Sequence, residues 1–309
     1  EDFVLFAMEN YSAEHYAVVL WNHGGGWKGL SNDDTDNPDG MSVQELANAL
    51  SNLKSKKNIK FDIIGFDMCS MGMLEVYSQI SDFGDIGIGS EELEPGEGWN
   101  YADLLKFITE NPTSDARTFA SEITQTYLDF HKDRTSEITL SAIDLSKINS
   151  VIQSISEIVS KMNSNMETFW PKITRANDVV EKYKSGSSFS YIDISDFFEL
   201  LIPKSLNTVL YNDLIATQSS VASAIIGNVA GTGHPFASGL SVYFPISSEE
   251  YDSKYELESK NFVDKTGWHD MVKRYYNTKE LDTEPPQISL ESYDILPDKI
   301  NFKVNLNGS

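Results

Sequence analysis

The sequence contains a single cysteine, Cys69, among 309 residues. One cysteine cannot form an internal disulfide, and a lone thiol is also a known pattern for a catalytic group. Basic residues are scarce too, because 24 Lys and Arg stand against 47 Asp and Glu, for a formal charge of −23. This acidity argues against nucleic acid and anionic membranes as partners and favours cationic peptides or bound cations.

Long apolar runs are also absent. No stretch of the sequence approaches the roughly 20 apolar residues that cross a bilayer, so we expect no membrane span, and no signal peptide is present. Hydrophobic residues make up 40% and charged residues 23% of the chain, which is typical of a globular protein with a packed core. The composition therefore predicts a soluble, folded domain.

Short apolar runs bounded by turn residues predict strands buried on both faces, as in parallel sheets. Such runs occur at residues 17–21, 61–66, 85–90, 138–143 and 239–245. Helices are predicted at residues 1–10, 42–53, 73–80, 101–109, 115–131, 145–169, 191–201, 206–229 and 268–276. Strands that alternate with helices in this way predict an α/β fold with a mostly parallel central sheet flanked by helices.

The end of the chain has a different pattern. Two prolines at 285 and 286 resemble a linker, and residues 288–290 and 300–306 alternate between apolar and polar side chains. A period of two is typical of β-strands. We therefore predict an α/β domain over residues 1–282, followed over residues 283–309 by a linker and the start of a C-terminal β-sandwich segment.

The two most reactive side chains follow the first two predicted strands. His23 stands in Trp-Asn-His-Gly-Gly-Gly-Trp at residues 21–27, and Cys69 stands in Asp-Met-Cys-Ser-Met-Gly at residues 67–72. Catalytic groups in open α/β sheets gather at the carboxyl ends of strands. A thiolate is a nucleophile, and an imidazole or a helix N-terminus promotes its formation. Cys69 and His23 are therefore a candidate nucleophile and base, with the N–H groups of Gly24 and Cys69 as oxyanion donors.

These two segments, residues 16–29 and 61–72, resemble the catalytic blocks of the clostripain family of cysteine peptidases, which is related to the caspases, legumain and the gingipains. Residues 90–99 and 239–245 are also similar, so the resemblance covers residues 1–277. It implies a caspase-like α/β sandwich and an endopeptidase that cleaves after Arg or Lys through a thioester on Cys69, with His23 as its partner. A secreted or cell-surface location is expected, with the signal outside this chain.

The resemblance also implies a specificity residue, because the family's acid lies two positions before the cysteine, at Asp67. Alternation along a strand end supports this placement, since residues two apart share a side. A carboxylate there pairs with a cationic substrate side chain. Glu91 and Glu94, which follow the neighbouring strand, are predicted to line the same pocket.

Two departures from the family concern the ends and the processing of the chain. Members usually begin with further strands before residue 16, so we expect a processed chain or a fragment. The family also matures by cutting itself at a basic residue between the two blocks. Residues 31–40 contain no Lys or Arg and only Lys28 precedes them, so cleavage in this acidic loop is not expected unless it follows Lys28.

No cofactor is required by this chemistry, and Ca²⁺ is the one metal considered, since calcium dependence occurs in the family. The acidic loop offers Asp33, Asp34, Asp36 and Asp39 as oxygen ligands. Thr35 and Leu46 occupy positions where an EF-hand has its first Asp and its bidentate Glu, so a solvated loop is the favoured interpretation. The three glycines after His23 lack the residues of a phosphate-binding loop.

The alternative to an enzyme is a non-catalytic caspase-like scaffold or adhesion module of a secreted multidomain protein. A lone cysteine is more often a small buried apolar group than a nucleophile. The His-Gly turn at a neighbouring strand end favours the catalytic interpretation. Trp21 and Trp27 are predicted to pack beside the site, and His234 is predicted to be a loop residue.

Overall fold

The computed structural model of the chain describes residues 1–33, 39–185, 188–281, 287–295 and 300–307. Five strands form the central sheet in the order β1 (Ala17–Trp21), β4 (Phe61–Asp67), β5 (Gly84–Gly89), β6 (Thr139–Asp144) and β9 (Ile225–Ala230). β1, β4 and β5 are parallel neighbours, whereas β6 is antiparallel to both β5 and β9. The predicted α/β class is confirmed, with a mixed sheet in which four of the five strands run in the same direction.

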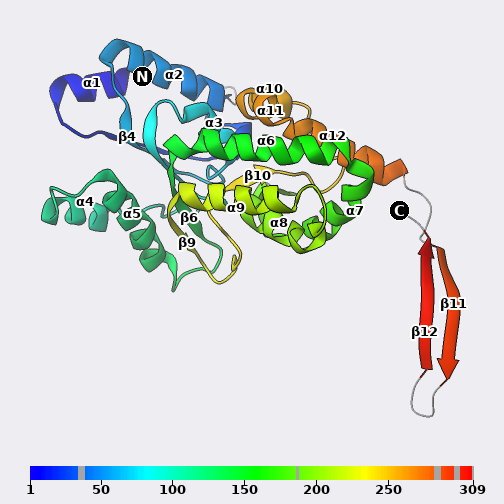
Figure 1. Cartoon of the computed structure of the whole chain (residues 1–309). Coiled ribbons are helices and arrows are strands. Elements are labelled where there is room, and N and C mark those ends of the chain that lie inside the picture. The colour runs from blue at the N-terminus through cyan, green and yellow to red at the C-terminus, as the bar shows by residue number, and fades with distance from the viewer. Residues whose placement is uncertain (34–38, 186–187, 282–286, 296–299, 308–309) are drawn as a thin grey trace.

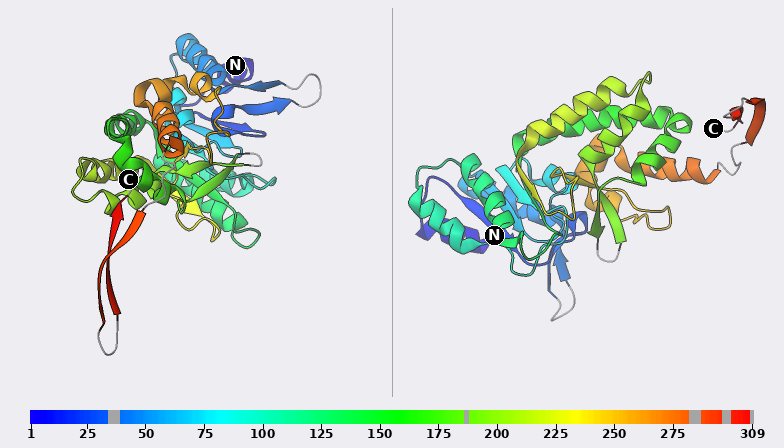
Figure 2. Two further views of the ribbon diagram at one scale, coloured as in Figure 1. Left: turned by 90° about the vertical axis from the view of Figure 1, so that its right-hand side faces the viewer. Right: turned by 90° about the horizontal axis from the view of Figure 1, so that it is seen from below.

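Helices cover both faces of this sheet (Figures 1 and 2). α2 (Val43–Lys57), α3 (Leu74–Ile80), α6 (Ile148–Ser164) and α9 (Tyr211–Ala224) share one hydrophobic core, whereas α4 (Tyr101–Glu110) and α5 (Ala116–His131) share another. On β4, Ile64 packs into the first core and Ile63 into the second. β4 is therefore buried on both faces, which is why its sequence is an unbroken apolar run.

The start of α2 follows its sequence signal closely. Ser42 Oγ accepts the Glu45 N–H at 3.2 Å, and the Glu45 carboxylate accepts the Ser42 N–H at 2.9 Å. This reciprocal pair is a capping box, which satisfies two backbone donors that the first turn leaves free. Before the sheet lies α1 (Asp2–Asn10), which has no fully buried residue, although Val4 and Leu5 pack against the first core.

A second sheet was not expected. β10 (Ser241–Tyr243), β8 (Ser188–Asp193) and β7 (Lys182–Ser185) form three antiparallel strands, so residues 239–245 are not part of the central sheet as predicted. The predicted helix at 191–201 is wrong in its first turn, because residues up to Asp193 belong to β8 and α8 spans Ile194–Leu201. The Asp193 side chain caps α8 by accepting the Asp196 N–H at 2.8 Å, which ends the strand.

The predicted helices at 145–169 and 206–229 have different bounds in the structure. The first divides at Asn165 into α6 and α7 (Met166–Asn177), and the second ends at Ala224, where the chain enters β9. The acidic loop at 31–40 is flanked by a short hairpin, β2 (Leu30–Asp33) and β3 (Asp39–Met41), while residues 34–38 lie outside the described residues. The remaining helices are η1 (Gly26–Lys28), η2 (Leu145–Lys147), η3 (Pro203–Ser205), α10 (Tyr255–Glu258), α11 (Lys260–Thr266) and α12 (Trp268–Leu281).

The C-terminal pattern of period two corresponds to two strands. β11 (Gln287–Ile295) and β12 (Ile300–Asn307) pair antiparallel in a sheet of their own. Residues 282–286, which include the expected linker, lie outside the described residues. That these strands begin a β-rich domain stays a prediction.

Glu75 on α3 is a buried carboxyl group that links three parts of the fold. Its Oε1 accepts the Tyr243 N–H and the Tyr255 hydroxyl, each at 2.8 Å, while Oε2 has no partner among the described residues. Burial raises the pKa of Glu75 to about 7 from 4.5. Because the folded pKa exceeds the unfolded one, the group stabilises the fold below pH 4.5 and this contribution is lost as the pH rises towards 7.

We expect Glu75→Gln to remove this pH dependence. Between pH 5 and 8, the free energy of unfolding of the wild type should fall by about 2 to 3 kcal/mol more than that of the variant. Urea unfolding at several pH values measures the difference. Glu249→Gln, at an exposed position, is the control and should follow the wild type. Parallel pH profiles for wild type and Glu75→Gln would contradict the expectation.

Candidate active site

The register of the first two strands brings His23 and Cys69 to the same edge of the sheet. β1 and β4 are parallel, and Trp21 pairs with Asp67 at the end of the ladder. His23 and Cys69 each stand two residues beyond this pair. Both line one pocket of about 490 Å³, whose walls consist of Trp21, Asn22, His23, Asp67, Met68, Cys69, Leu93, Glu94, Pro95, Gly96 and Gly98. The predicted nucleophile and base therefore face a common cavity.

Cys69 lies in a sharp turn rather than at a helix N-terminus. Ser70 has φ +59°, and its N–H donates to the Glu92 carbonyl at 3.0 Å. α3 begins only at Leu74, five residues after Cys69, so the first turn of this helix does not include the thiol. Met73, just before the helix, is extended (φ −116°, ψ 146°) and forms a bridge with Ser241 in the second sheet.

The thiol contacts the loop that follows β5. Cys69 Sγ accepts the Glu94 N–H at 3.3 Å, and Cys69 is partly exposed. The His23 side chain is exposed, and no hydrogen bond joins it to Sγ within the described part of the chain. Hydrogen bonds of a catalytic pair often tighten only when substrate binds, so this geometry is compatible with a dyad.

The turn after His23 packs tightly against the cysteine. A Cβ atom at Gly24 would lie 2.3 Å from the Cys69 carbonyl oxygen and 2.9 Å from Met68 Cβ, so only glycine fits. The N–H groups of Gly24 and Cys69 donate to no acceptor in the described residues. Two unused donors next to a thiol are what an oxyanion requires.

Asp67 is a buried acid with two donors. Its side chain is 3% exposed, and Oδ2 accepts the Tyr101 hydroxyl at 2.8 Å and the Trp99 N–H at 3.3 Å. Gly98, at φ +61°, approaches so closely that a Cβ there would lie 2.6 Å from Oδ1. The loop that carries Gly98 and Trp99 thus holds the Asp67 carboxylate at the wall of the pocket.

The structure separates the two other predicted acids. Glu94 lines the pocket, whereas Glu91 does not and is fully buried behind it. Glu91 Oε2 accepts the Gly239 N–H at 3.0 Å. Burial, with the nearby Asp193 carboxylate, raises the pKa of Glu91 well above its usual range. Its position indicates a structural role that joins the loop after β5 to the segment leading into β10.

The aromatic and imidazole groups near the site differ in their burial. Trp21 is 68% exposed and forms part of the pocket wall because β1 is an edge strand, whereas Trp27 is buried as predicted. His234 lies in a loop but is buried, with Nδ1 3.0 Å from Glu181. Tyr101, which contacts Asp67, was missed, because this contact joins residues that are distant in sequence and no local pattern indicates it.

Lys28, the basic residue nearest to the site, is held in a folded turn. Gly29 N–H donates to the Gly26 carbonyl at 3.1 Å, and the Gly29 carbonyl accepts the Gly25 N–H at 2.9 Å. The Lys28 ammonium lies 5.7 Å from the centre of the Trp27 ring. Cleavage after Lys28 would require this turn to open first.

The Ca²⁺ hypothesis falls mainly outside the described residues, since the acidic loop includes residues 34–38. Among the residues that the structure describes, no group of three or more His, Cys, Asp or Glu side chains is arranged to hold a metal ion. In the same part of the chain, no helix is both long and apolar enough to cross a membrane.

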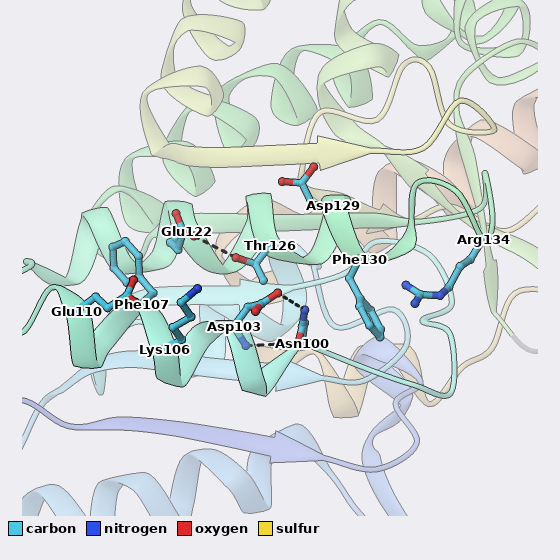
Figure 3. A pocket seen from close by; sticks show the side chains of 10 residues that line it. All are labelled: Asn100, Asp103, Lys106, Phe107, Glu110, Glu122, Thr126, Asp129, Phe130 and Arg134. Carbon is cyan, nitrogen blue, oxygen red and sulfur yellow. Dashed lines mark hydrogen bonds between the residues drawn. The ribbon is translucent and has the colours of Figure 1, made fainter.

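A separate hollow of about 450 Å³ lies between α4 and α5 (Figure 3). Its lining includes both acidic and basic side chains, and several of them already form hydrogen bonds or ring contacts within the protein. Asn100 caps α4 by accepting the Asp103 N–H, and the Arg134 guanidinium lies 4.0 Å from the centre of the Phe130 ring. None of the predicted site residues lines it, so the chemistry is assigned to the pocket at the edge of β1 and β4.

Comparisons with known proteins agree with this fold. Clostripain from Hathewaya histolytica is 22% identical over 307 aligned residues, which cover 82% of this chain and 57% of clostripain, so the chain spans little more than half the length of that relative. A secreted C11 cysteine protease from Bacteroides thetaiotaomicron, solved with an irreversible peptide inhibitor, superposes with a TM-score of 0.67 at 18% identity, over 87% of this chain and 77% of that one.

An inactive zymogen of a C11 protease from Parabacteroides distasonis superposes with a TM-score of 0.59 at 18% identity, over 88% of this chain and 74% of that one. At these identities the structural matches establish the fold alone. The sequence model of the clostripain family matches residues 1–276, which is most of the chain. This match shows that the chain belongs to the clostripain family, peptidase family C11, and the caspase-like fold agrees with it.

Proposed function

We propose that this chain is a cysteine endopeptidase that hydrolyses peptide bonds after Arg or Lys. The observation that carries the proposal is that His23, Cys69 and Asp67 line one pocket at the carboxyl edge of two parallel strands. A nucleophile, a base and a buried acid are then within one cavity. The fold of the C11 proteases supports the same assignment, and the secreted relative supports a location outside the cell.

The proposed reaction uses groups that are present in the pocket. His23 accepts the thiol proton of Cys69, and Sγ attacks the substrate carbonyl carbon to form a tetrahedral oxyanion next to the N–H groups of Gly24 and Cys69. His23 then donates the proton to the leaving amine, and a thioester remains. Water, activated by His23, hydrolyses the thioester and restores the thiol.

The side chain of the residue before the cleaved bond is proposed to contact Asp67 and Glu94. No Lys or Arg is among the residues that line the described pocket, so the pocket presents acids without a matching cation. An arginine guanidinium or a lysine ammonium supplies the missing charge. Contacts with a buried carboxylate are stronger than on the surface, since water screens them less.

Matched fluorogenic peptides that differ only at the cleavage position test the proposal. Peptides with Arg and Lys are expected to be cleaved, and peptides with Ala or Glu are not. An arginine-derived acyloxymethyl ketone should add one equivalent of mass to the protein, and peptide mapping should place it on Cys69. Failure of the protein to react with the ketone and to cleave the Arg peptide would favour the scaffold alternative.

Tyr101→Phe is expected to reduce kcat/KM for the Arg peptide by about five- to tenfold. The change removes only the hydroxyl that donates to Asp67, a bond to a charged acceptor that is partly exposed to water. The loss should appear mainly in KM, since Tyr101 positions the acid and does not contact the reacting atoms. Tyr11→Phe, at an exposed position, is the matched control. Equal values of kcat/KM for Tyr101→Phe and wild type would remove Tyr101 from the site.

A further inference from the structure

The Glu94 carboxyl group is the least satisfied polar group in the pocket. Both of its oxygens are buried, and neither receives a hydrogen bond from an N–H or O–H donor of the described residues. The indole nitrogen of Trp99, which lies near it, makes no hydrogen bond either. A buried carboxylate without donors is costly, so a carboxyl group in this setting holds its proton.

Asp67 differs from its neighbour in this respect. Its Oδ2 accepts two hydrogen bonds, from the Tyr101 hydroxyl and the Trp99 N–H. Two carboxyl groups in one buried site do not both ionise easily, because like charges repel strongly where water is excluded. Within the described residues Glu94 has no such donors, so it is the member of the pair whose anion burial disfavours.

The other groups around the pair do not change this conclusion. Cys69 follows β4, Tyr101 lies on α4 and Tyr127 on α5, and each of these is neutral or becomes an anion when it loses a proton. His131 on α5 faces the Gly98 carbonyl at 2.9 Å. Burial, and next the Asp67 carboxylate, raise the pKa of Glu94 well above its usual range. No described Lys or Arg lines the pocket to offset this.

We propose that the Glu94 carboxyl group carries a proton while the pocket is empty, and that a guanidinium or ammonium group of the substrate displaces this proton to solvent. This inference rests on the proposed function, because it takes a basic side chain as the ligand. The balance is simple: the Glu94 carboxyl loses its proton, the proton leaves to water, and two carboxylates then pair with one cation. Binding of a basic side chain is thus coupled to the release of one proton.

The coupling makes recognition depend on pH in a way that neutral substrates do not share. Where Glu94 is protonated in the empty pocket and ionised in the complex, affinity for the cation should rise about tenfold per pH unit. Lower pH should therefore weaken binding of basic side chains selectively. The pocket should also reject a neutral analogue of arginine, since such a ligand cannot stabilise both carboxylates.

Isothermal titration calorimetry of the full chain carrying Cys69→Ala tests this, with a tetrapeptide that ends in Arg at the cleavage position. Titrations at pH 7 in phosphate and in Tris, which differ in ionisation enthalpy, give the number of protons released. We expect one proton for the Arg peptide and none for the same peptide with citrulline. Adding Glu94→Gln, which keeps an N–H donor towards Asp67, should abolish the release and weaken binding, whereas Glu97→Gln in the same loop should change neither.

The possible outcomes separate the inference from the proposed function. Binding of the Arg peptide with equal heats in both buffers would overturn the release of a proton from Glu94 and leave the basic specificity intact. Release of a proton that persists in Glu94→Gln would also overturn it, since another group would then titrate. Absence of binding, or equal binding of the citrulline and Arg peptides, would overturn the proposed specificity and the inference with it.

Discussion

Replacing Cys69 with alanine is expected to reduce kcat/KM for an Arg peptide by a factor on the order of 10⁵. The reason is that Sγ forms the bond to the substrate, and the pocket contains no other thiol or hydroxyl that could replace it. The remaining activity would come from substrate positioning and from the two N–H donors. Continuous fluorogenic assays with enzyme concentrations raised for the variant measure the ratio.

Because the sequence contains a single cysteine, thiol labelling reports on Cys69 alone. Iodoacetamide should label the wild type once and the variant not at all, since Cys69 is the only thiol in the sequence. The two proteins should unfold at nearly the same temperature, because within the described residues Sγ makes only weak contacts, with the Glu94 N–H at 3.3 Å and the Glu94 carbonyl at 4.0 Å. Comparable peptide cleavage by a correctly folded Cys69→Ala variant would show that the activity arises elsewhere, and the dyad would have to be abandoned.

The shared position of His23 and Cys69, the proposed dyad, could be predicted from sequence because the information for it is local. Each of the two segments consists of a buried strand followed by a turn, and both features are visible in a short window. Parallel pairing of the two strands then places the two side chains together. Trp21 and Asp67 are in register, and His23 and Cys69 each lie two residues beyond them. Two local patterns and one topological rule thus bring the two side chains to one edge.

The positions of the other predicted site residues depend on contacts between segments that are far apart in the sequence. Glu91 and Glu94 stand three residues apart, yet Ser90 bonds to Thr139 on β6 and turns the chain so that Glu91 points towards Gly239. Sequence alone could not separate these acids. The same applies to residues 225–230, which form the edge strand β9 through pairing with β6, although the preceding Ala and Ser residues extend a helical pattern.

Asp67→Asn should have the second largest effect, and it should be selective. The asparagine oxygen can still accept the Tyr101 hydroxyl and the Trp99 N–H, so the loop should keep its conformation. The negative charge of Asp67 is lost, however, and Glu94 is then the only acid left among the described residues of the pocket to pair with the substrate cation. Removing one member of a buried charge pair costs about 3 to 4 kcal/mol, which corresponds to roughly a 100- to 1,000-fold decrease in kcat/KM for Arg and Lys peptides.

Neutral peptides should respond differently, because their side chains form no ion pair with Asp67. Their slow cleavage should change little in Asp67→Asn, so the ratio of Arg to norleucine cleavage isolates specificity from general damage. Asp62→Asn is the matched control, since Asp62 lies on the same strand, contacts His15 and the Tyr16 N–H, and is remote from the pocket. An Arg to norleucine ratio that stays at the wild-type value in Asp67→Asn would place the specificity acid elsewhere, and Glu94 would then be the carboxylate that faces the substrate.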